Sequence, residues 1–147
     1  MKILLAIDDS KFSAAASQVI AERVRPEHTE VFVLHVVEPL SMIPYQYLTE
    51  VRSLEAAQQR HLAEGKELVE RTRQLLSKAG FTVQAAVEEG DPRATIVDRA
   101  VQWSPDLIAV GSRGRRGLDR LLIGSVAEFI VRHAHCTVMI VRVPLDR

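Results

Sequence analysis

The stretch DLIAVGSRGRRGLDRLLIGSV, residues 106–126, decides how this chain folds. It starts with an apolar run that ends at Gly111, and Gly114 follows after two intervening residues. Gly124 and Ser125 come after nine more residues, where the pattern predicts the start of a helix. A buried strand that passes through a glycine-rich connection into a helix is typical of an α/β fold.

Other short apolar runs, rich in β-branched residues, have the same character. The predicted strands are residues 2–7, 30–37, 81–87, 106–110 and 137–143. Several are apolar at successive positions, which is typical of strands buried on both faces of a parallel sheet. Helical patterns separate them, so we expect a mostly parallel sheet joined by right-handed crossovers. With 147 residues, the chain fits one domain, residues 1–147.

The helices are predicted from their end signals and apolar faces. Ser10 is a favoured N-cap, Asp91-Pro92 opens a helix, and Gly80 ends a long helical stretch over residues 47–78. The positions expected to be buried are Phe12, Ala15, Ala16, Val19 and Ile20; Leu48, Val51, Leu54, Leu62, Leu68, Val69, Leu75 and Leu76; Ile96, Val97, Ala100 and Val101; and Val126, Phe129 and Ile130.

Composition excludes several classes of protein. Lys plus Arg and Asp plus Glu both number 19, and a nonspecific nucleic-acid binder usually has a basic excess. The single cysteine, Cys136, excludes an internal disulfide. No apolar run approaches the roughly 18–20 residues of a membrane span, and the first strand starts at once, so we expect no membrane insertion, no signal peptide and a cytoplasmic location.

The glycine-rich connection has the chemistry of a polyphosphate site. Glycines let the backbone approach an anion closely, and amides at a helix N-terminus favour negative charge. The Ser125 hydroxyl adds a donor, and Arg113 and Arg115 add positive charge. The alternative is a structural connection with a serine cap and no ligand. A position at the carboxyl end of a parallel strand, where open α/β sheets bind ligands, favours the nucleotide site.

Gly111, Gly114, Gly124 and Ser125 have the spacing found in ATP-binding universal stress proteins, and here the sequence resembles that family. The segments KILLAIDDS, VFVLHVVEP, VEEGDPRATIV and HAHCTVMIVR resemble further parts of it, so the likeness covers nearly the whole chain. The spacing is not the dinucleotide fingerprint, and there is no Walker motif. One departure is Asp9, where the family often has glycine.

The resemblance implies a single-domain three-layer sandwich of the adenine nucleotide alpha hydrolase-like type, with a five-stranded parallel sheet of order 3-2-1-4-5. It also implies binding of ATP (or ADP or AMP) with Mg²⁺ or Mn²⁺ at the phosphates, and a contact from Asp8 either to the ribose or to the phosphate-bound metal. The implied binding residues are Ala6, Asp8, Val36, Gly111, Ser112, Arg113, Gly114, Arg115, Gly117, Gly124, Ser125 and Val126. Homodimers would form through the last strand, from Thr137 to Val143.

Other candidates favour structural roles. We expect Asp9 to help cap the first helix, and Arg116 and Arg120 to face solvent. His133, His135 and Cys136 lie where a helix gives way to a strand, so they should diverge rather than bind a metal. Glu88 and Glu89 fit a solvated turn better than acid–base catalysis. Trp103 fits packing, and Tyr45 and Tyr47 would reach a nucleotide only if their loop folds over it.

Function remains open between three hypotheses. The first is a nucleotide-dependent stress-response regulator with at most slow ATP hydrolysis, since no general base is evident near Ser125. The second is an ATP-hydrolysing or adenylyl-transferring enzyme of the same fold, although Asp8-Asp9-Ser10 stands where related ligases carry a Ser-Gly-Gly loop. The third is a dimeric scaffold that binds no nucleotide.

Overall fold

The computed structural model describes residues 1–40, 51–114 and 123–143. In chain order its elements are β1 (Lys2–Ile7), α1 (Lys11–Arg23), β2 (Glu30–Val37), α2 (Val51–Lys78), β3 (Thr82–Glu89), α3 (Pro92–Trp103), β4 (Leu107–Gly111), α4 (Ser125–His133) and β5 (Thr137–Val141). The sheet order is β3-β2-β1-β4-β5, and every neighbouring pair is parallel. The predicted fold class and strand order are therefore confirmed.

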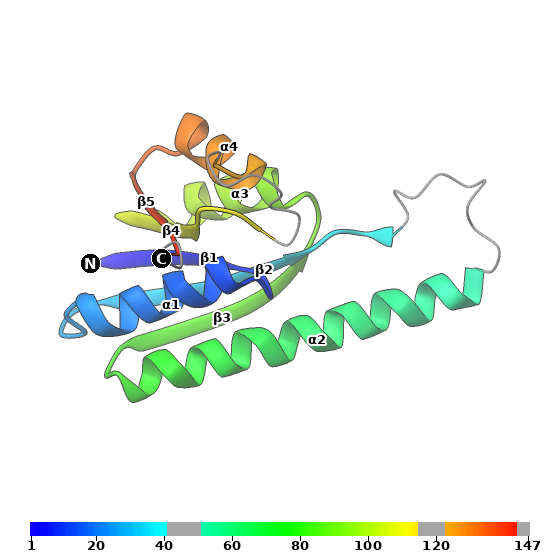
Figure 1. Ribbon diagram of the computed structural model, residues 1–147, viewed down its shortest axis with the longest axis horizontal. Coiled ribbons are helices and arrows are strands. Elements are labelled where there is room, and N and C mark those ends of the chain that lie inside the picture. The colour runs from blue at the N-terminus through cyan, green and yellow to red at the C-terminus, as the bar shows by residue number, and fades with distance from the viewer. Residues whose placement is uncertain (41–50, 115–122, 144–147) are drawn as a thin grey trace.

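The sheet lies between two helical layers (Figure 1). Helices α1 and α2 cover one face, and α3 and α4 cover the other. Alternation along β1 sends Ile3, Leu5 and Ile7 to the first face and Leu4 and Ala6 to the second. All five of these side chains are buried, as a continuous apolar run predicts for a central parallel strand.

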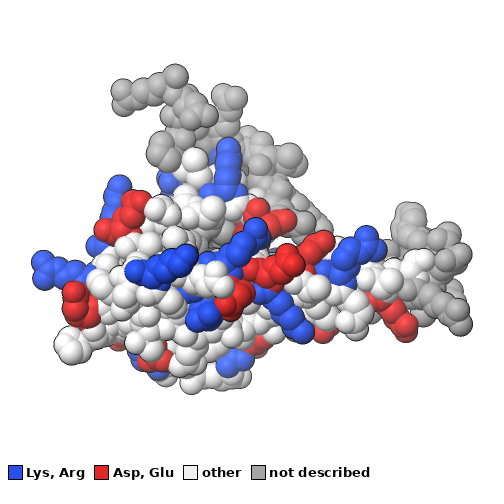
Figure 2. Space-filling model, turned by 90° about the horizontal axis from the view of Figure 1, so that it is seen from below, with Lys and Arg blue, Asp and Glu red and all other residues white. Residues whose placement is uncertain are grey.

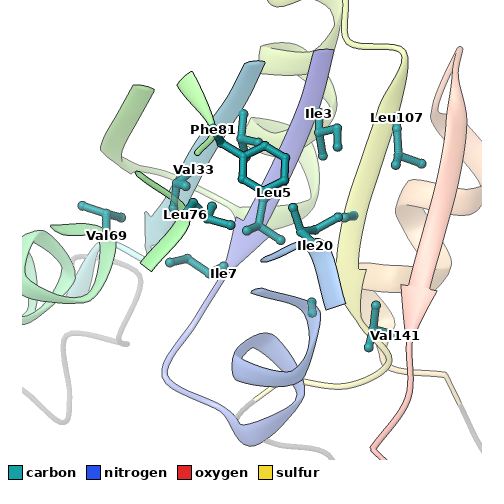
Figure 3. Close-up of a cluster of buried hydrophobic side chains, with 13 residues drawn as sticks. Ile3, Leu5, Ile7, Ile20, Val33, Val69, Leu76, Phe81, Leu107 and Val141 are labelled. Atoms are coloured by element: carbon teal, nitrogen blue, oxygen red, sulfur yellow. The ribbon is translucent and has the colours of Figure 1, made fainter. Parts of the chain in front are cut away.

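The core on the α1–α2 face is aliphatic, with one aromatic ring. Figure 3 shows Leu5 of β1 near Ile20 of α1, Leu76 of α2 and Phe81. Leu5, Ile20 and Leu76 are completely inaccessible to solvent. Burial of each such side chain contributes about 1.5–3 kcal/mol of stability. This face therefore anchors α1 and α2 firmly against β1 and β2, whose carboxyl ends they flank.

Local signals at the helix ends act as predicted. Ser10 caps α1 by accepting a hydrogen bond from the Ser13 N–H at 3.2 Å, and Asp91 caps α3 by accepting from the Arg93 N–H at 3.1 Å. Gly80 has a φ of +98°, the left-handed conformation in which glycine ends a helix.

Two predicted apolar faces need correction. Leu75 is 37% exposed because it lies along a groove between α1 and α2, and Val101 is 60% exposed although it follows the apolar face of α3. The observed strand bounds also differ from the predicted ones. Strand β3 ends at Glu89 rather than at residue 87, and β5 ends at Val141 rather than Val143. Residues 47–50 of the predicted long helix, Leu48 among them, lie outside the described residues.

Charge is distributed evenly on the face that carries α2. Figure 2 shows basic and acidic side chains interspersed there. In one α2 pair, the hydrogen bond from Arg73 is the main cause that lowers the pKa of Glu70 to about 2. No helix in the described part of the chain is both long enough and apolar enough to cross a membrane.

Candidate nucleotide-binding cleft

A cleft of about 810 Å³ opens at the carboxyl edge of the sheet. It forms because β1 and β4 are neighbours whose outgoing connections diverge: β1 leads to α1 on one face, and β4 leads to α4 on the other. Such a topological switch point is where open α/β sheets bind ligands. The ends of β1, β2 and β4 form the floor, and α2 and the first residues of α3 and α4 form the walls.

The N-terminus of α4 meets the exit of β4 at close range. Gly124 is the N-cap of α4, and no side chain caps this helix. The Gly124 N–H donates to the Ser112 carbonyl oxygen at 2.7 Å, and a Cβ on Gly124 would lie 3.1 Å from Arg113 Cα. The first-turn amides of a helix have no intrahelical acceptor, and the helix dipole adds positive potential there. This arrangement suits an anion at Ser125 and Val126.

Asp8 is fixed between β1, α1 and the glycine-rich connection. Its Oδ1 accepts hydrogen bonds from the Ser10 N–H and the Ser13 hydroxyl, both at 2.9 Å, and its own N–H donates to Ser13 Oγ at 2.9 Å. Its Oδ2 lies only 2.8 Å from where a Cβ of Gly114 would stand. A side chain at position 114 would therefore collide with this carboxylate.

Arg113 brings a cation to the same edge. Its guanidinium carbon lies 5.9 Å from the ring centre of Phe12 on α1, within the range of a cation–π contact. Arg113 and Gly114 both line the cleft, and so do Gly124 and Ser125. A positive charge, a helix N-terminus and a glycine backbone thus share one end of the cleft, which is the chemistry expected for phosphate recognition.

Most of the predicted binding residues meet at this cleft. Those that line it are Ala6, Asp8, Val36, Gly111, Arg113, Gly114, Gly124, Ser125 and Val126. Ser112 does not: it is 7% exposed, and its backbone bonds to Val141 and Gly124 instead. Arg115 and Gly117 lie outside the described residues, as do Arg116, Arg120, Tyr45 and Tyr47.

Position 111 requires glycine for a structural reason that sequence analysis missed. A Cβ there would stand 2.6 Å from the backbone carbonyl carbon of Phe12. Its hydrogen side chain therefore lets α1 pack against β4, in addition to its place along the cleft.

Sequence analysis also did not predict that α2 forms a wall of the cleft. His61, Glu64, Gly65 and Arg71 line it from α2, and His35 lines it from β2. One signal for this wall was available: Gly65 lies inside a helix, where glycine costs about 1 kcal/mol relative to alanine. A glycine retained at such a position indicates a close neighbour, and here the neighbour is the His35 ring.

The remaining candidates have structural partners. Glu88 and Glu89 belong to β3 rather than to a turn; Glu88 pairs with Arg99, and Glu89 accepts from Gln58 at 3.2 Å. Trp103 packs edge-on against Phe32 with ring centres 5.4 Å apart.

Within the described ranges, no group of three or more histidine, cysteine, aspartate or glutamate residues is placed to hold a metal ion. His133 Nδ1 bonds to the Phe129 carbonyl oxygen at 2.8 Å. Burial raises the pKa of the Cys136 thiol, so this residue favours the protonated, unreactive form.

Comparison with known proteins gives a consistent result. Residues 1–142 match the model of the universal stress protein family. Universal stress protein MJ0531 of Methanocaldococcus jannaschii is 31% identical over 143 residues, which cover 97% of this chain and 82% of that protein.

Solved structures share the whole fold. Universal stress protein UspA from Lactobacillus plantarum superimposes with a TM-score of 0.82 at 25% identity, covering 97% of each chain. A universal stress protein family protein from Arabidopsis thaliana, solved with AMP bound, superimposes with a TM-score of 0.71 at 23% identity, covering 99% of this chain and 94% of that one.

Proposed function

Because this chain belongs to the universal stress protein family, we propose that it binds an adenine nucleotide, with ATP as the complete ligand, and acts as a cytoplasmic nucleotide-dependent stress-response regulator. One observation carries the proposal: the uncapped N-terminus of α4 opens into the cleft beside Gly114 and Arg113. The Arabidopsis thaliana family member with bound AMP supports the choice of an adenine ligand.

In the proposed complex the phosphates lie at the α4 end and the nucleoside lies toward β1 and β2. The first-turn amides of α4, the Ser125 hydroxyl and Arg113 supply hydrogen bonds and positive charge to the phosphates. The nucleoside lies across the ends of β1 and β2, where Ala6 and Val36 line the cleft and are only 7% and 9% exposed. Apolar walls there suit a flat base, whose burial is favourable.

Asp8 fits the role of a single protein ligand to a nucleotide-bound Mg²⁺ or Mn²⁺. Its Oδ1 is held by Ser10 and Ser13, which leaves Oδ2 on the side of Gly114. Mg²⁺ is commonly bound through one or two carboxylates together with substrate phosphates. When bound, the ion would neutralise phosphate charge.

We propose that this nucleotide is a signal rather than a rapidly consumed substrate. Apart from Asp8, which we assign to the metal, the described cleft residues at the α4 end are donors and a cation, which hold phosphate but do not by themselves activate a water. Turnover below about one per second, the low end for ordinary enzymes, is therefore the expected outcome when phosphate release is measured with ATP.

The proposed partner is a second copy of the chain along β5. This strand is at the end of the sheet order, and Val138, Met139 and Ile140 are all partly exposed. An apolar edge strand with open backbone groups is a template for pairing with another chain.

Ligand release tests the nucleotide site directly. Small molecules freed by denaturing the purified protein are identified by mass spectrometry, and binding of ATP, ADP and AMP is measured by calorimetry. We expect an adenine nucleotide from the wild type. A Gly114→Val, Ser125→Ala double variant should lose it and bind ATP at least about tenfold more weakly, since it displaces Asp8 and removes a phosphate donor.

Ser77→Ala is the matched control, because Ser77 is exposed near the C-terminal end of α2, away from the cleft residues. Thermal unfolding establishes that all variants are folded. A wild type that releases no nucleotide and gives no heat with ATP, ADP or AMP would contradict the proposal and favour the scaffold. Release of AMP and pyrophosphate from ATP would instead favour the adenylyl-transfer enzyme.

A further inference from the structure

His35 stands in the last row of the sheet in which β1 still pairs with β2, beside the cleft. It pairs in register with Ile7 of β1 and Val87 of β3. In the row beneath, Val33 and Leu5 are completely buried aliphatic residues. An imidazole therefore replaces an aliphatic side chain at the point where the hydrophobic core gives way to the cleft.

One contact fixes which nitrogen of His35 carries the proton. Nδ1 lies 2.8 Å from the carbonyl oxygen of Ile7. A carbonyl oxygen only accepts hydrogen bonds, so in the neutral ring Nδ1 is the donor and Nε2 keeps its lone pair. The same bond ties the end of β2 to the residue that precedes Asp8.

The second nitrogen is open. Among the residues that the structure describes, Nε2 has no hydrogen-bond partner. Nor is it sealed from solvent: within the described ranges, Arg99 Nε is the only side-chain nitrogen or oxygen that is buried without a partner. An accessible acceptor at the cleft is thus left available.

Gly65 of α2 makes room for this edge of the ring. A Cβ at position 65 would stand 2.8 Å from His35 Cδ2 and 3.5 Å from Nε2. Both residues line the cleft. Glycine weakens a helix interior, and here it leaves the space that the His35 ring occupies.

Resting on the proposed function, we infer that His35 Nε2 is a specificity-determining acceptor for the nucleoside half of the ligand. The phosphate end of the cleft follows β4, and β2 lies two strands away in the sheet, a distance of roughly 10 Å. A lone pair disfavours phosphate oxygens and favours a donor. The donors on that half of an adenine nucleotide are the exocyclic amine and the ribose hydroxyls.

The experiment compares AMP with analogues that each lack one donor. Binding to the wild type and to His35→Asn is measured by calorimetry for AMP, purine riboside monophosphate (AMP without its exocyclic amine), 2′-deoxy-AMP and 3′-deoxy-AMP. The asparagine amide can keep the bond to the Ile7 carbonyl but has no atom at the place of Nε2. His133→Asn is the matched control, since its Nδ1 also bonds to a backbone carbonyl and its side chain is exposed.

We expect at least one analogue to bind the wild type roughly twofold to tenfold more weakly than AMP, the effect of one hydrogen bond. That penalty should vanish in His35→Asn and persist in His133→Asn. The analogue concerned identifies the donor as the amine or a particular hydroxyl. Equal penalties in wild type and His35→Asn, including none in either, would overturn the inference while leaving nucleotide binding intact.

A measurement on the wild type covers the case in which His35→Asn does not fold. With ¹⁵N-labelled histidine, the Nε2 resonance of His35 should move toward the hydrogen-bonded position when AMP is added. It should stay closer to its free position with the analogue that lacks the donor. An unchanged resonance at saturating AMP would refute the role of His35, whereas absence of binding by every nucleotide would refute the proposed function as well.

Discussion

Gly111 and Gly114, at the glycine-rich connection after β4, are required for different physical reasons. Gly111 faces backbone atoms of Phe12, with a virtual Cβ 2.6 Å from its carbonyl carbon. Gly114 faces the end of the Asp8 side chain, with a virtual Cβ 2.8 Å from Oδ2. The backbone of a packed helix cannot easily move, whereas the Asp8 carboxylate can be displaced at the expense of its hydrogen bonds to Ser10 and Ser13. The same substitution should therefore mainly lower stability at position 111 and mainly weaken nucleotide binding at position 114.

We predict that Gly111→Ala lowers the free energy of unfolding by about 1–3 kcal/mol, the usual cost of overpacking. Gly114→Ala should cost less stability but weaken nucleotide binding, because it displaces Asp8. Urea denaturation and calorimetry of the two variants test this pair. Equal losses of stability in both variants would show that the two glycines do not differ in this way.

The start of α1 serves both the helix and the site. Ser10 caps the helix through its hydroxyl, whereas the Ser13 hydroxyl donates to Asp8 Oδ1 and accepts from the Asp8 N–H. Ser13 is 5% exposed, so removal of its hydroxyl would leave polar groups of Asp8 without a partner. Helix α1 thus orients Asp8, which precedes it, through the buried hydroxyl of Ser13 in its first turn.

Ser10→Ala is predicted to cost about 1 kcal/mol of stability through the lost cap, with little change in nucleotide affinity. Ser13→Ala should cost about 1–3 kcal/mol and also weaken nucleotide binding, since Asp8 loses its support. Chemical denaturation gives the first quantity, and titration with ATP and Mg²⁺ gives the second. If Ser10→Ala weakened binding as much as Ser13→Ala, the orienting role would not belong to Ser13.

At the scale of the whole molecule, the open edge of β5 is the surface at which we propose that a second copy of the chain pairs. Val141, however, belongs to the protomer's own core and is 7% exposed, so a charge there would unfold the chain rather than test pairing. Ile140 is only partly buried. A lysine at that position can extend its ammonium to solvent in the single chain but not in a paired edge.

We therefore predict that Ile140→Lys converts a dimer to a folded monomer, as measured by light scattering at several protein concentrations. Val101→Lys is the control, because Val101 is exposed on α3, away from β5. A dimeric Ile140→Lys protein would rule out the β5 edge as the interface, and a monomeric wild type would rule out the dimer itself.

The helices and strands were largely predictable because their signals are local, whereas the strand order was implied by the family resemblance. Continuous apolar runs such as residues 2–7 indicate strands buried on both faces, and Ser10, Asp91 and Gly80 mark helix ends by their own chemistry. The predictions of burial were wrong where contacts with other elements determine whether a side chain is buried. Leu75 and Val101 fit apolar helical faces, but the packing of the helices leaves both side chains exposed.

For the site, the sequence by itself determined the glycine-rich connection, the serine that opens α4 and the acidic turn after β1, because their spacing along the chain carries the information. Only the tertiary structure decided that α2 supplies a wall, that Gly111 makes room for α1, and that His35 presents Nε2 beside Gly65. These contacts join residues of different elements, and their geometry depends on how helices pack on the sheet, which no local pattern specifies.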